Sequence, residues 1–271
     1  MEKYLHIVDQ SDALSSALLE NNITYVVLHK ILKRKCSKIF TNRESFIVCY
    51  SSAPYPVWVW CKDENNLQDV ETIMQILAEN FPLESGYNII LSTALLAKLK
   101  KHDARYNDCR LKMDLLSYRL DRLENTPHVC DGEIELANKV DIEILSRYYK
   151  EMTYEMEGLE FSIQRSKELI AEKIEKGNIF IWRNVKGDIV ATTAKEDGEK
   201  YSKISLVYTV PQYRRMGYAI NLVYKVAEGI LKDGLIPILY ADGGYIASNS
   251  CYKKVGFYQV GSLCNIQAKG L

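Results

Sequence analysis

The residues of this sequence that are best suited to chemistry lie between Lys203 and Ala219. A basic turn in this stretch contains Arg214 and Arg215, and Gly217 follows at the start of a predicted helix. The free N–H groups of a first helical turn point towards a ligand, and the helix dipole favours negative charge. Together with the two arginines, this arrangement predicts a site for an anion such as a diphosphate.

A strand and a helix are predicted on the two sides of this turn. Residues 203–210 are rich in β-branched and aromatic side chains, which favours a strand. Pro211 cannot donate a hydrogen bond to a neighbouring strand, so we expect the strand to end there. After the turn, apolar residues recur at helical spacing, at Ala219, Leu222, Val223, Val226 and Ile230.

The composition limits the class of protein. The chain has 271 residues, enough for one large domain or two medium ones. Its 35 Lys+Arg and 35 Asp+Glu give a formal net charge of zero, which argues against non-specific nucleic-acid binding.

The seven cysteines show no Cys-x-x-Cys or paired Cys/His spacing, so we expect reduced thiols and no metal site. With neither a signal-peptide hydrophobic region nor an apolar run of roughly 20 residues, we expect a cytoplasmic protein.

The first half of the chain alternates helical and strand patterns, as an α/β layer does. The expected order is two short helices before residue 33, strands at 45–50 and 57–60, a helix at 67–81, a strand at 87–91, a helix at 94–101 and a strand at 111–120. Residues 123–128 are polar and contain a proline, which is typical of a linker. We therefore expect one domain at 1–125 and a second at 131–271.

The second half surrounds the basic turn with further elements. Before the turn we expect a strand at 132–137, a helix after Asp141, an acidic link at 154–161, a helix at 162–176 and a hairpin of 178–183 with 188–194. After the turn we expect a strand at 236–241, a short helix at 250–254 and a pair of strands around 258–266.

Two motifs of this half resemble those of the GCN5-related N-acetyltransferase (GNAT) superfamily. Residues 214–219, Arg-Arg-Met-Gly-Tyr-Ala, match its acyl-CoA-binding motif Q/R-x-x-G-x-G/A, and residues 252–257, Tyr-Lys-Lys-Val-Gly-Phe, look like its second signature, Y-x-K-x-G-F. The resemblance covers roughly residues 131–271 and implies a mixed, mostly antiparallel sheet flanked by helices there. With the α/β domain predicted for the N-terminal half, the expected fold class of the chain is α/β (α+β). The N-terminal half resembles the family only in element order, and a degenerate second copy is one interpretation of it.

The resemblance also implies roles for individual residues. Backbone N–H groups of Val207, Tyr208 and Thr209 would bind the pantetheine arm of acetyl-CoA, or of another acyl-CoA, and polarise the thioester carbonyl. Tyr252 would act as general acid towards the leaving thiolate. The further residues expected to bind the cosubstrate are Arg214, Arg215, Met216, Gly217, Tyr218, Ala219, Ile220 and Asn249. The asparagine that often precedes the last helix of the family is absent, and Tyr245 stands at that spacing.

The general base is left open by the resemblance. Several family members carry a glutamate near the position of Lys203, but no carboxylate lies between Lys203 and Val210. Glu155 and Glu160 of the acidic link are our candidates, because this link lines the acceptor pocket in the family fold. The neighbouring Glu151 and Glu157 are alternatives, and solvated surface charge is the simpler interpretation of each of these four residues.

We therefore predict an N-acyltransferase that moves an acetyl or other short acyl group from acyl-CoA to a primary amine of a small molecule. The acceptor amine would attack directly in a ternary complex. Acylation of an amino acid or of a protein amine is one alternative, and a non-catalytic acyl-CoA sensor is another. The antiparallel hairpin and the lack of G-x-G-x-x-G argue against a doubly wound nucleotide-binding fold. We expect no nucleic-acid or membrane partner, and either a monomer or a homodimer.

Overall fold

Side chains of the strands alternate between two apolar layers, as the pleat of a β-strand requires. In β4 (Val57–Cys61), Val57 and Val59 face one apolar cluster while Trp58 and Trp60 face another. The computed structural model describes residues 5–6, 23–32, 38–124, 126–127, 130–158 and 160–269, and the predicted helix near Ser11 lies outside them. The chain divides into unit 1 (Met1–Ser117, Ala241–Gly244 and Gln259–Leu271) and unit 2 (Tyr118–Tyr240 and Tyr245–Tyr258).

The sheet of unit 1 is antiparallel except where β4 runs parallel to its neighbour β5. The last strand of the chain, β12, lies next to β5 and pairs with it through Cys264 and Leu91. The strands in sheet order are β1 (Leu5–His6), β2 (Lys38–Thr41), β3 (Phe46–Tyr50), β4, β5 (Ile89–Leu91), β12 (Tyr258–Ala268) and β6 (Cys109–Arg119). The C-terminal end of the sequence therefore completes the N-terminal unit.

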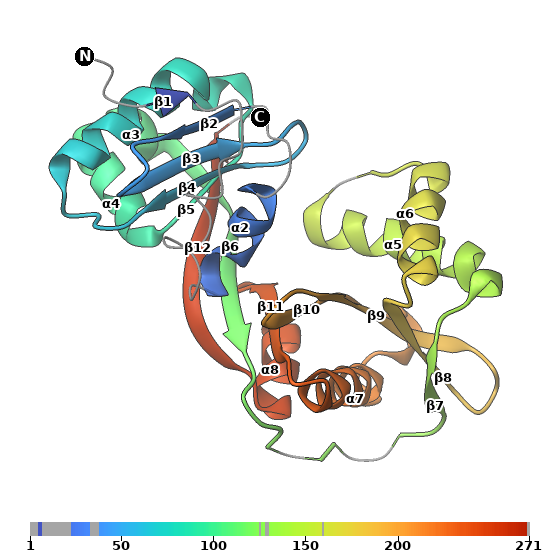
Figure 1. The fold of residues 1–271 in the computed structure, drawn as a ribbon. Helices are drawn as coiled ribbons and strands as arrows, with labels where there is room; N and C mark the ends of the chain where they lie inside the picture. The colour runs from blue at the N-terminus through green and yellow to red at the C-terminus, as the bar shows by residue number, and fades with distance from the viewer. Residues whose placement is uncertain are drawn as a thin grey trace. The chain divides into compact units, whose positions relative to one another are not determined.

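Helices cover both faces of the unit 1 sheet (Figure 1). The helices α3 (Leu67–Asn80) and α4 (Thr93–His102) bury Ile73, Leu77 and Leu99 against one face. On the other face, α2 (Val26–Leu32) and the preceding 3-10 turn η2 (Ile23–Tyr25) pack on Trp58 and Trp60. The two tryptophans thus face the same side of the sheet, as their spacing predicts.

The sheet of unit 2 is antiparallel from β7 to β10, and its last pair, β10 with β11, is parallel. Beside β11, the N–H of Leu120 donates to the carbonyl of Pro237 at 3.0 Å, so the chain that leaves β6 lies along this edge. The strands in sheet order are β11 (Ile236–Asp242), β10 (Tyr201–Thr209), β9 (Ile189–Asp197), β8 (Ile179–Arg183) and β7 (Glu133–Leu136).

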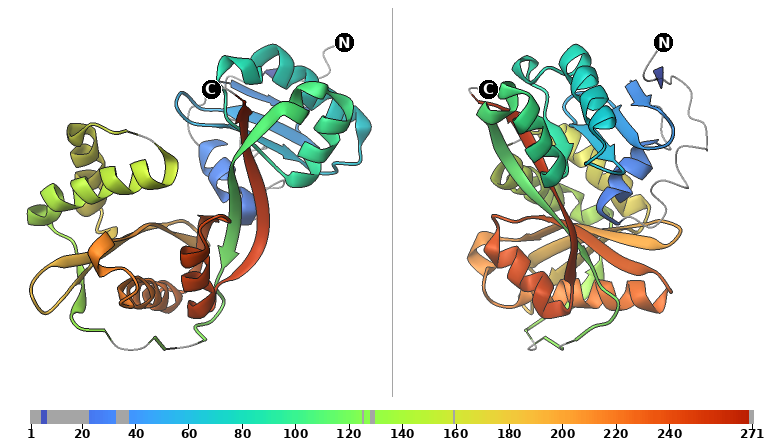
Figure 2. Two further views of the ribbon diagram at one scale, coloured as in Figure 1. Left: turned by 180° about the vertical axis from the view of Figure 1, so that it is seen from behind. Right: turned by 90° about the vertical axis from the view of Figure 1, so that its left-hand side faces the viewer.

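Two helices lie on each side of the unit 2 sheet, as Figure 2 shows from behind and from the side. On one side, α5 (Ile142–Glu157) and α6 (Ile163–Glu175) bury Leu145 and Ile170 against β8 and β9. On the other side, α7 (Tyr218–Lys232) packs on β8, β9 and β10 through its apolar stripe, and α8 (Ile246–Val255) packs on α7. The stripe predicted for α7 is confirmed, since Leu222, Val223 and Ile230 are buried.

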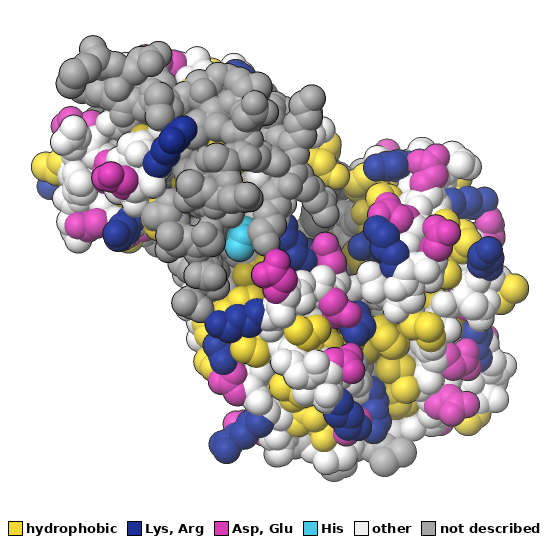
Figure 3. Space-filling view, viewed as in Figure 1, with side chains coloured by type: hydrophobic (Ala, Val, Ile, Leu, Met, Phe, Trp, Pro, Cys, Tyr) yellow, Lys and Arg dark blue, Asp and Glu magenta, His cyan; other side chains and the backbone are white. Residues whose placement is uncertain are grey.

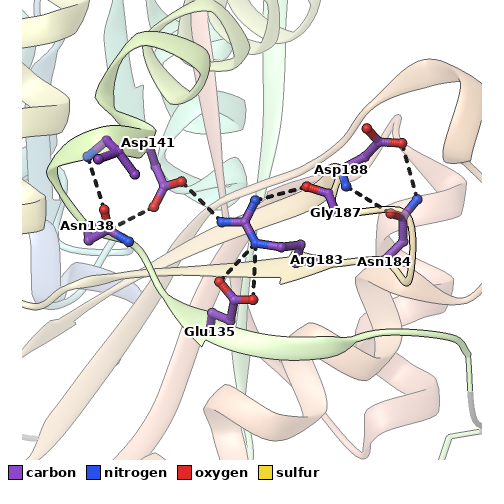
Figure 4. Close-up of polar contacts among 8 residues, drawn as sticks. Glu135, Asn138, Asp141, Arg183, Asn184, Gly187 and Asp188 are labelled. Atoms are coloured by element: carbon purple, nitrogen blue, oxygen red, sulfur yellow. Dashed lines mark hydrogen bonds and ion pairs between the residues drawn. The ribbon is translucent and has the colours of Figure 1, made fainter.

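Arg183 at the end of β8 joins three segments of unit 2 (Figure 4). Its Nε lies 3.1 and 3.0 Å from the carboxylate oxygens of Glu135, and its Nη2 donates to Asp141 at 3.2 Å. Its Nη1 donates to the carbonyl of Gly187 at 3.0 Å. Asp141 is buried and also accepts from the N–H of Asn138 at 2.9 Å. These bonds fix the start of α5 relative to β7 and to the β8–β9 turn.

Three expectations from the sequence need correction. A strand at Lys38–Thr41 was not expected, because its four residues are too few to show an alternating pattern. The expected pair of strands around 258–266 is the single strand β12. The expected link at 154–161 is helical as far as Glu157, and the helix ends at Gly158, which has a positive φ of 65°.

The surface carries both signs of charge, in agreement with the balanced composition. On the face drawn in Figure 3, Lys and Arg side chains are interspersed with Asp and Glu. Within the described part of the chain, no helix is long and apolar enough to cross a membrane. The same residues contain no group of three or more His, Cys, Asp and Glu side chains suited to a metal ion.

Candidate functional site

β10 and β11 separate at the centre of unit 2. The two strands pair from Tyr201 with Ile236 to Ile204 with Leu239, and no later residue of β10 pairs with β11 in the described structure. On its other side, β10 remains paired with β9, with a register shift between Ser205 and Tyr208 where Leu206 has a φ of 53°. From residue 205 to 209, this edge of β10 therefore has no strand partner in the described structure.

The N-terminus of α7 lies directly after this edge. Gly217 caps the helix with a φ of 91°, no side chain caps it, and its first turn contains no acidic residue. Because the first N–H groups of a helix have no partner within it, those of Tyr218 and Ala219 are available to an anion. A Cβ at Gly217 would meet nothing closer than Asn221 Nδ2 at 3.7 Å, so the backbone conformation, rather than space, requires glycine here.

The turn between β10 and α7 is tied to the rest of unit 2. The hydroxyl of Tyr213 donates to Asp188 at 2.8 Å, and the hydroxyl of Tyr218 donates to Asp131. The N–H of Val210 donates to the carbonyl of Val190 at 3.0 Å. These bonds hold the turn in place before any ligand binds, which lowers the entropic cost of binding.

The two arginines of the turn have different surroundings. The guanidinium of Arg214 donates to both carboxylate oxygens of Glu155 on α5, at 2.8 and 2.6 Å, and to the carbonyl of Thr209 at 3.1 Å. It also lies over the ring of Tyr208, 5.7 Å from the centroid. Arg215 has a φ of 65° and an exposed side chain that forms no ion pair within the described part of the chain. Arg215 is therefore the arginine that is available to an anion.

Tyr208 connects the open edge of β10 with α5. Its hydroxyl donates to the carboxylate of Glu151 at 2.9 Å, and its ring lies 5.7 Å from that of Tyr148. Burial, reinforced by the bond to Glu151, raises the pKa of Tyr208, so its phenol stays protonated. Glu151 was not among our two preferred candidates for the base. Glu151 lies four residues before Glu155, so both side chains lie on one face of a helix. This spacing in the sequence could have indicated that Glu151 lies near the site.

A groove of about 540 Å³ runs along α5 beside Glu151. Side chains of both charges line it: Arg147, Lys150, Glu151, Tyr154, Glu160 and Ile163. Glu160, a candidate base, thus lies in this groove, whereas Glu155 is engaged by Arg214. Glu151 lines the groove and also accepts the hydrogen bond from Tyr208 of β10. It therefore connects the groove with β10.

Tyr252 is buried on α8. Its side chain is 7% exposed, and its ring lies 6.2 Å from that of Tyr118 and 6.3 Å from that of Phe257. Burial, with smaller contributions from Cys251 and Tyr118, raises the pKa of Tyr252. The phenol is therefore protonated near neutral pH, as a proton donor must be.

Asn249 and Tyr245 lie one and two turns before Tyr252 on α8. The side chain of Asn249 accepts from the hydroxyl of Tyr118 at 2.9 Å and donates to the carbonyl of Tyr245 at 3.0 Å. The hydroxyl of Tyr245 donates to the main-chain carbonyl of Glu155 at 2.9 Å. The end of α5 is therefore bonded both to the turn after β10 and to the start of α8.

Comparisons with known proteins agree with this geometry. Residues 181–264 match the model of a family described as FR47-like protein, and no curated protein sequence matches the chain. A GCN5-related N-acetyltransferase from Sphaerobacter thermophilus is similar in structure, with a TM-score of 0.72 and 13% identity over 98% of this chain and 95% of that one. A GNAT-family acetyltransferase from Colwellia psychrerythraea has a TM-score of 0.65 and 16% identity over 98% and 100% of the two chains.

The chain has the GNAT fold. A GCN5-related N-acetyltransferase from Kribbella flavida is also similar, with a TM-score of 0.59 and 13% identity over 92% of this chain and 95% of that one. Since these matches extend over nearly the whole chain, the likeness includes unit 1. The predicted resemblance and fold class are confirmed. The fold of the chain is thus that of the GNAT structures, and residues 181–264 are similar to the FR47-like family.

Apart from the candidate bases Glu155 and Glu160, the predicted site residues fall into three places within unit 2. Val207, Tyr208 and Thr209 form the open edge of β10, and residues 214–220 form the turn and the first turn of α7. Tyr252 and Asn249 lie on α8. Their contacts with an acyl-CoA remain predictions, as do the domain limits drawn from the sequence.

Proposed function

We propose that the protein is an acyl-CoA-dependent N-acyltransferase that transfers an acetyl or other short acyl group to the primary amine of a small molecule. The observation that carries this proposal is the separation of β10 from β11 after Ile204, directly before the uncapped N-terminus of α7. An open strand edge followed by a free helix N-terminus suits a ligand with an amide-containing arm and a diphosphate.

The diphosphate would bind to the turn from Arg214 to Ile220. The lack of an acidic residue in the first turn of α7 and of a side-chain cap supports this assignment. Arg215 would supply a positive charge, because its side chain is exposed. Arg214 would contribute through its backbone, since its guanidinium is bound to Glu155.

The acyl-bearing arm would bind along the free edge of β10. Backbone groups of Val207, Tyr208 and Thr209 would hydrogen-bond the arm and donate to the thioester carbonyl, where negative charge develops as the amine attacks. The register shift between Ser205 and Tyr208 supports this role, because a bulge turns backbone groups away from the regular ladder.

Tyr252 would protonate the leaving thiolate. In the transfer, the amine nitrogen forms a bond to the carbonyl carbon, the carbon–sulfur bond breaks, the amine loses a proton and the sulfur gains one. Burial keeps the phenol of Tyr252 protonated near neutral pH, so the side chain holds a proton that it can donate. Asn249 would support the site from the same helix through its bond to Tyr118.

The acceptor amine would enter from the groove on α5. Glu151 is our preferred carboxylate for taking up its proton, directly or through a water molecule, because Glu151 reaches both the groove and Tyr208. Glu160 lines the same groove and is the second candidate. Glu155 would act by positioning, since its carboxylate holds Arg214.

We also propose that the reaction takes place in the cytoplasm. The described cysteines form no disulfide, and three of them, Cys49, Cys61 and Cys264, are buried, which is typical of proteins from reducing compartments. The acceptor would be a small-molecule amine, and the protein would act as a monomer or homodimer without nucleic acid or membrane.

A thermal-shift experiment with a matched pair of variants tests the cosubstrate. Acetyl-CoA is expected to raise the melting temperature of the wild type and of Gly217→Asn, but not of Gly217→Asp. Both substitutions place a side chain of nearly the same shape at a positive φ that Asn and Asp tolerate, so only the added negative charge distinguishes them. A wild type that shows no shift with any acyl-CoA contradicts the proposal.

A further inference from the structure

Unit 1 contains a cavity of about 350 Å³ at the end of β4. Residues from η2, β4, the link before α3, the cap of α4 and β12 line it: Thr24, Tyr25, Trp60, Cys61, Lys62, Glu64, Ser92, Gly261, Ser262 and Leu263. A Cβ at Gly261 would lie 2.1 Å from Thr24 Oγ1, so the glycine allows η2 to approach β12 closely. The cavity thus lies where η2, the end of β4 and β12 meet.

The chain around this cavity repeats the strand–helix–strand path of the site in unit 2, with different chemistry. β4, α3 and the parallel strand β5 correspond in order to β10, α7 and β11. The N-terminus of α3, however, is capped by the side chain of Asn66, which accepts from the N–H groups of Gln68 and Asp69. An already capped helix with an acidic first turn is unsuited to a diphosphate. The N-terminus of α3 therefore does not offer the kind of anion site that we propose at α7.

The carboxylate of Glu64, in the link before α3, lines the cavity. The hydroxyl of Ser92 donates to Glu64, and the same oxygen accepts from the N–H of Leu95 at 3.0 Å, so Ser92 holds the Glu64 carboxylate at the cavity. Glu64 adds to the effect of burial in raising the pKa of Tyr25, and the pKa of Cys61 is raised to about 12 by burial with Asp69, Glu64 and Asp63. The carboxylates of Glu64, Asp63 and Asp69 therefore place negative charge near these two side chains.

Two aromatic side chains, Tyr25 and Trp60, also line the cavity. They are each 6% exposed and belong to the same apolar cluster. Lys62 also lines the cavity, but its side chain is exposed, so its charge can remain in solvent.

We propose that this cavity binds a small organic ammonium ion, whose charged group pairs with Glu64 and whose apolar part contacts Tyr25 and Trp60. A carboxylate next to aromatic side chains is a common arrangement for binding organic cations, since both attract positive charge. The site is separate from the acceptor groove of unit 2, with which it shares no residue. It gives unit 1 a binding role that does not depend on acyl transfer.

Ligand-observed NMR on the full chain tests this proposal with n-butylammonium as the probe and n-butyrate, of equal chain length and opposite charge, as the comparison. We expect n-butylammonium to bind and n-butyrate not to bind. Glu64→Gln is expected to raise the dissociation constant about tenfold or more, because a charge-assisted interaction is lost. Tyr25→Phe, which keeps the ring and removes the hydroxyl, is expected to weaken binding to a smaller extent.

Two further variants make the outcome specific to the cavity. Glu44→Gln removes an exposed carboxylate elsewhere in unit 1 and is expected to bind n-butylammonium as the wild type does. Glu151→Gln removes the carboxylate in the groove of unit 2 and therefore reports any binding of the probe there. The proposal is overturned if the wild type does not bind the probe, if n-butyrate binds equally well, or if folded Glu64→Gln and Tyr25→Phe both bind it unchanged. Loss of binding in Glu151→Gln alone would place the probe in unit 2 and also overturn it.

Discussion

Arg214, in the turn after β10, donates to both carboxylate oxygens of Glu155 on α5, at 2.8 and 2.6 Å. The first arginine of the acyl-CoA motif is thus directed towards the helix that lines the groove. Glu155 also accepts from Tyr245 through its main-chain carbonyl, at 2.9 Å. The end of α5 therefore bonds to the chain segments that follow both separated strands, β10 and β11.

The two arginines of the motif are expected to respond differently to substitution. Arg215→Gln is expected to raise the dissociation constant of acetyl-CoA by about tenfold or less, since one exposed charge facing a diphosphate is worth about 1.4 kcal/mol or less. This effect is expected to shrink at high salt, because screening weakens the attraction. Titration calorimetry at two ionic strengths measures it.

Arg214→Gln is expected to weaken mainly the binding of the acceptor. Loss of its bond to Glu155 frees the end of α5 beside the groove, so the acceptor KM is expected to rise while the dissociation constant of acetyl-CoA changes little. Glu155→Gln is expected to have the same effect, and the double variant is expected to be no worse than either single one. Equal losses of acetyl-CoA affinity in Arg214→Gln and Arg215→Gln would contradict this assignment.

Glu151 is expected to be the most important carboxylate of the groove. Glu151→Gln is expected to lower kcat/KM for the acceptor about 100-fold, as loss of a general base does, while acetyl-CoA still raises the melting temperature. Glu143→Gln, on the same helix in an exposed ion pair with Lys167, is the control and is expected to retain activity. If Glu160→Gln loses activity and Glu151→Gln does not, the base is Glu160.

Tyr252 is expected to contribute to turnover and not to cosubstrate binding. Tyr252→Phe retains the ring in its buried place, so acetyl-CoA binding is expected to persist while kcat falls about 100-fold. Because burial raises the pKa of Tyr252 above the ordinary phenol value of about 10, a protonated donor persists through alkaline pH. The wild-type kcat is therefore expected to show no descending limb below about pH 10. Unchanged turnover in Tyr252→Phe would remove this residue from the mechanism.

Local patterns in the sequence predict most of the elements around the site. The strand before Pro211 and the apolar stripe of α7 depend on residues close together in the chain, and both are present. The pairing of Arg214 with Glu155 is not visible in this way, because the two residues are 59 positions apart. Only the packed fold shows which carboxylate of α5 meets the turn.

Two errors in the sequence-based expectations have physical causes. Residues 154–157, Tyr-Glu-Met-Glu, carry no apolar stripe and resemble a link, yet Glu and Met are good helix formers, so α5 continues to Gly158. Gly261 resembles the turn of a strand pair, whereas it lies inside β12 at the point where Thr24 approaches the backbone. In the first case the helix propensity of the residues outweighs the missing apolar pattern, and in the second the contact with Thr24 explains the glycine.

The contacts of Arg183 give a prediction about stability. Arg183→Met is expected to lower the free energy of unfolding by about 1–3 kcal/mol, because it leaves the buried carboxylate of Asp141 without its ion pair. The loss is expected to stay below that of a fully buried pair, because Glu135 is partly exposed to solvent and Asp141 keeps its bond to the N–H of Asn138. Arg165→Met, which breaks an exposed pair with Glu168 on α6, is expected to cost less than about 0.5 kcal/mol. Urea unfolding of the two variants measures the difference, and equal losses would show that Arg183 contributes no more than a surface charge.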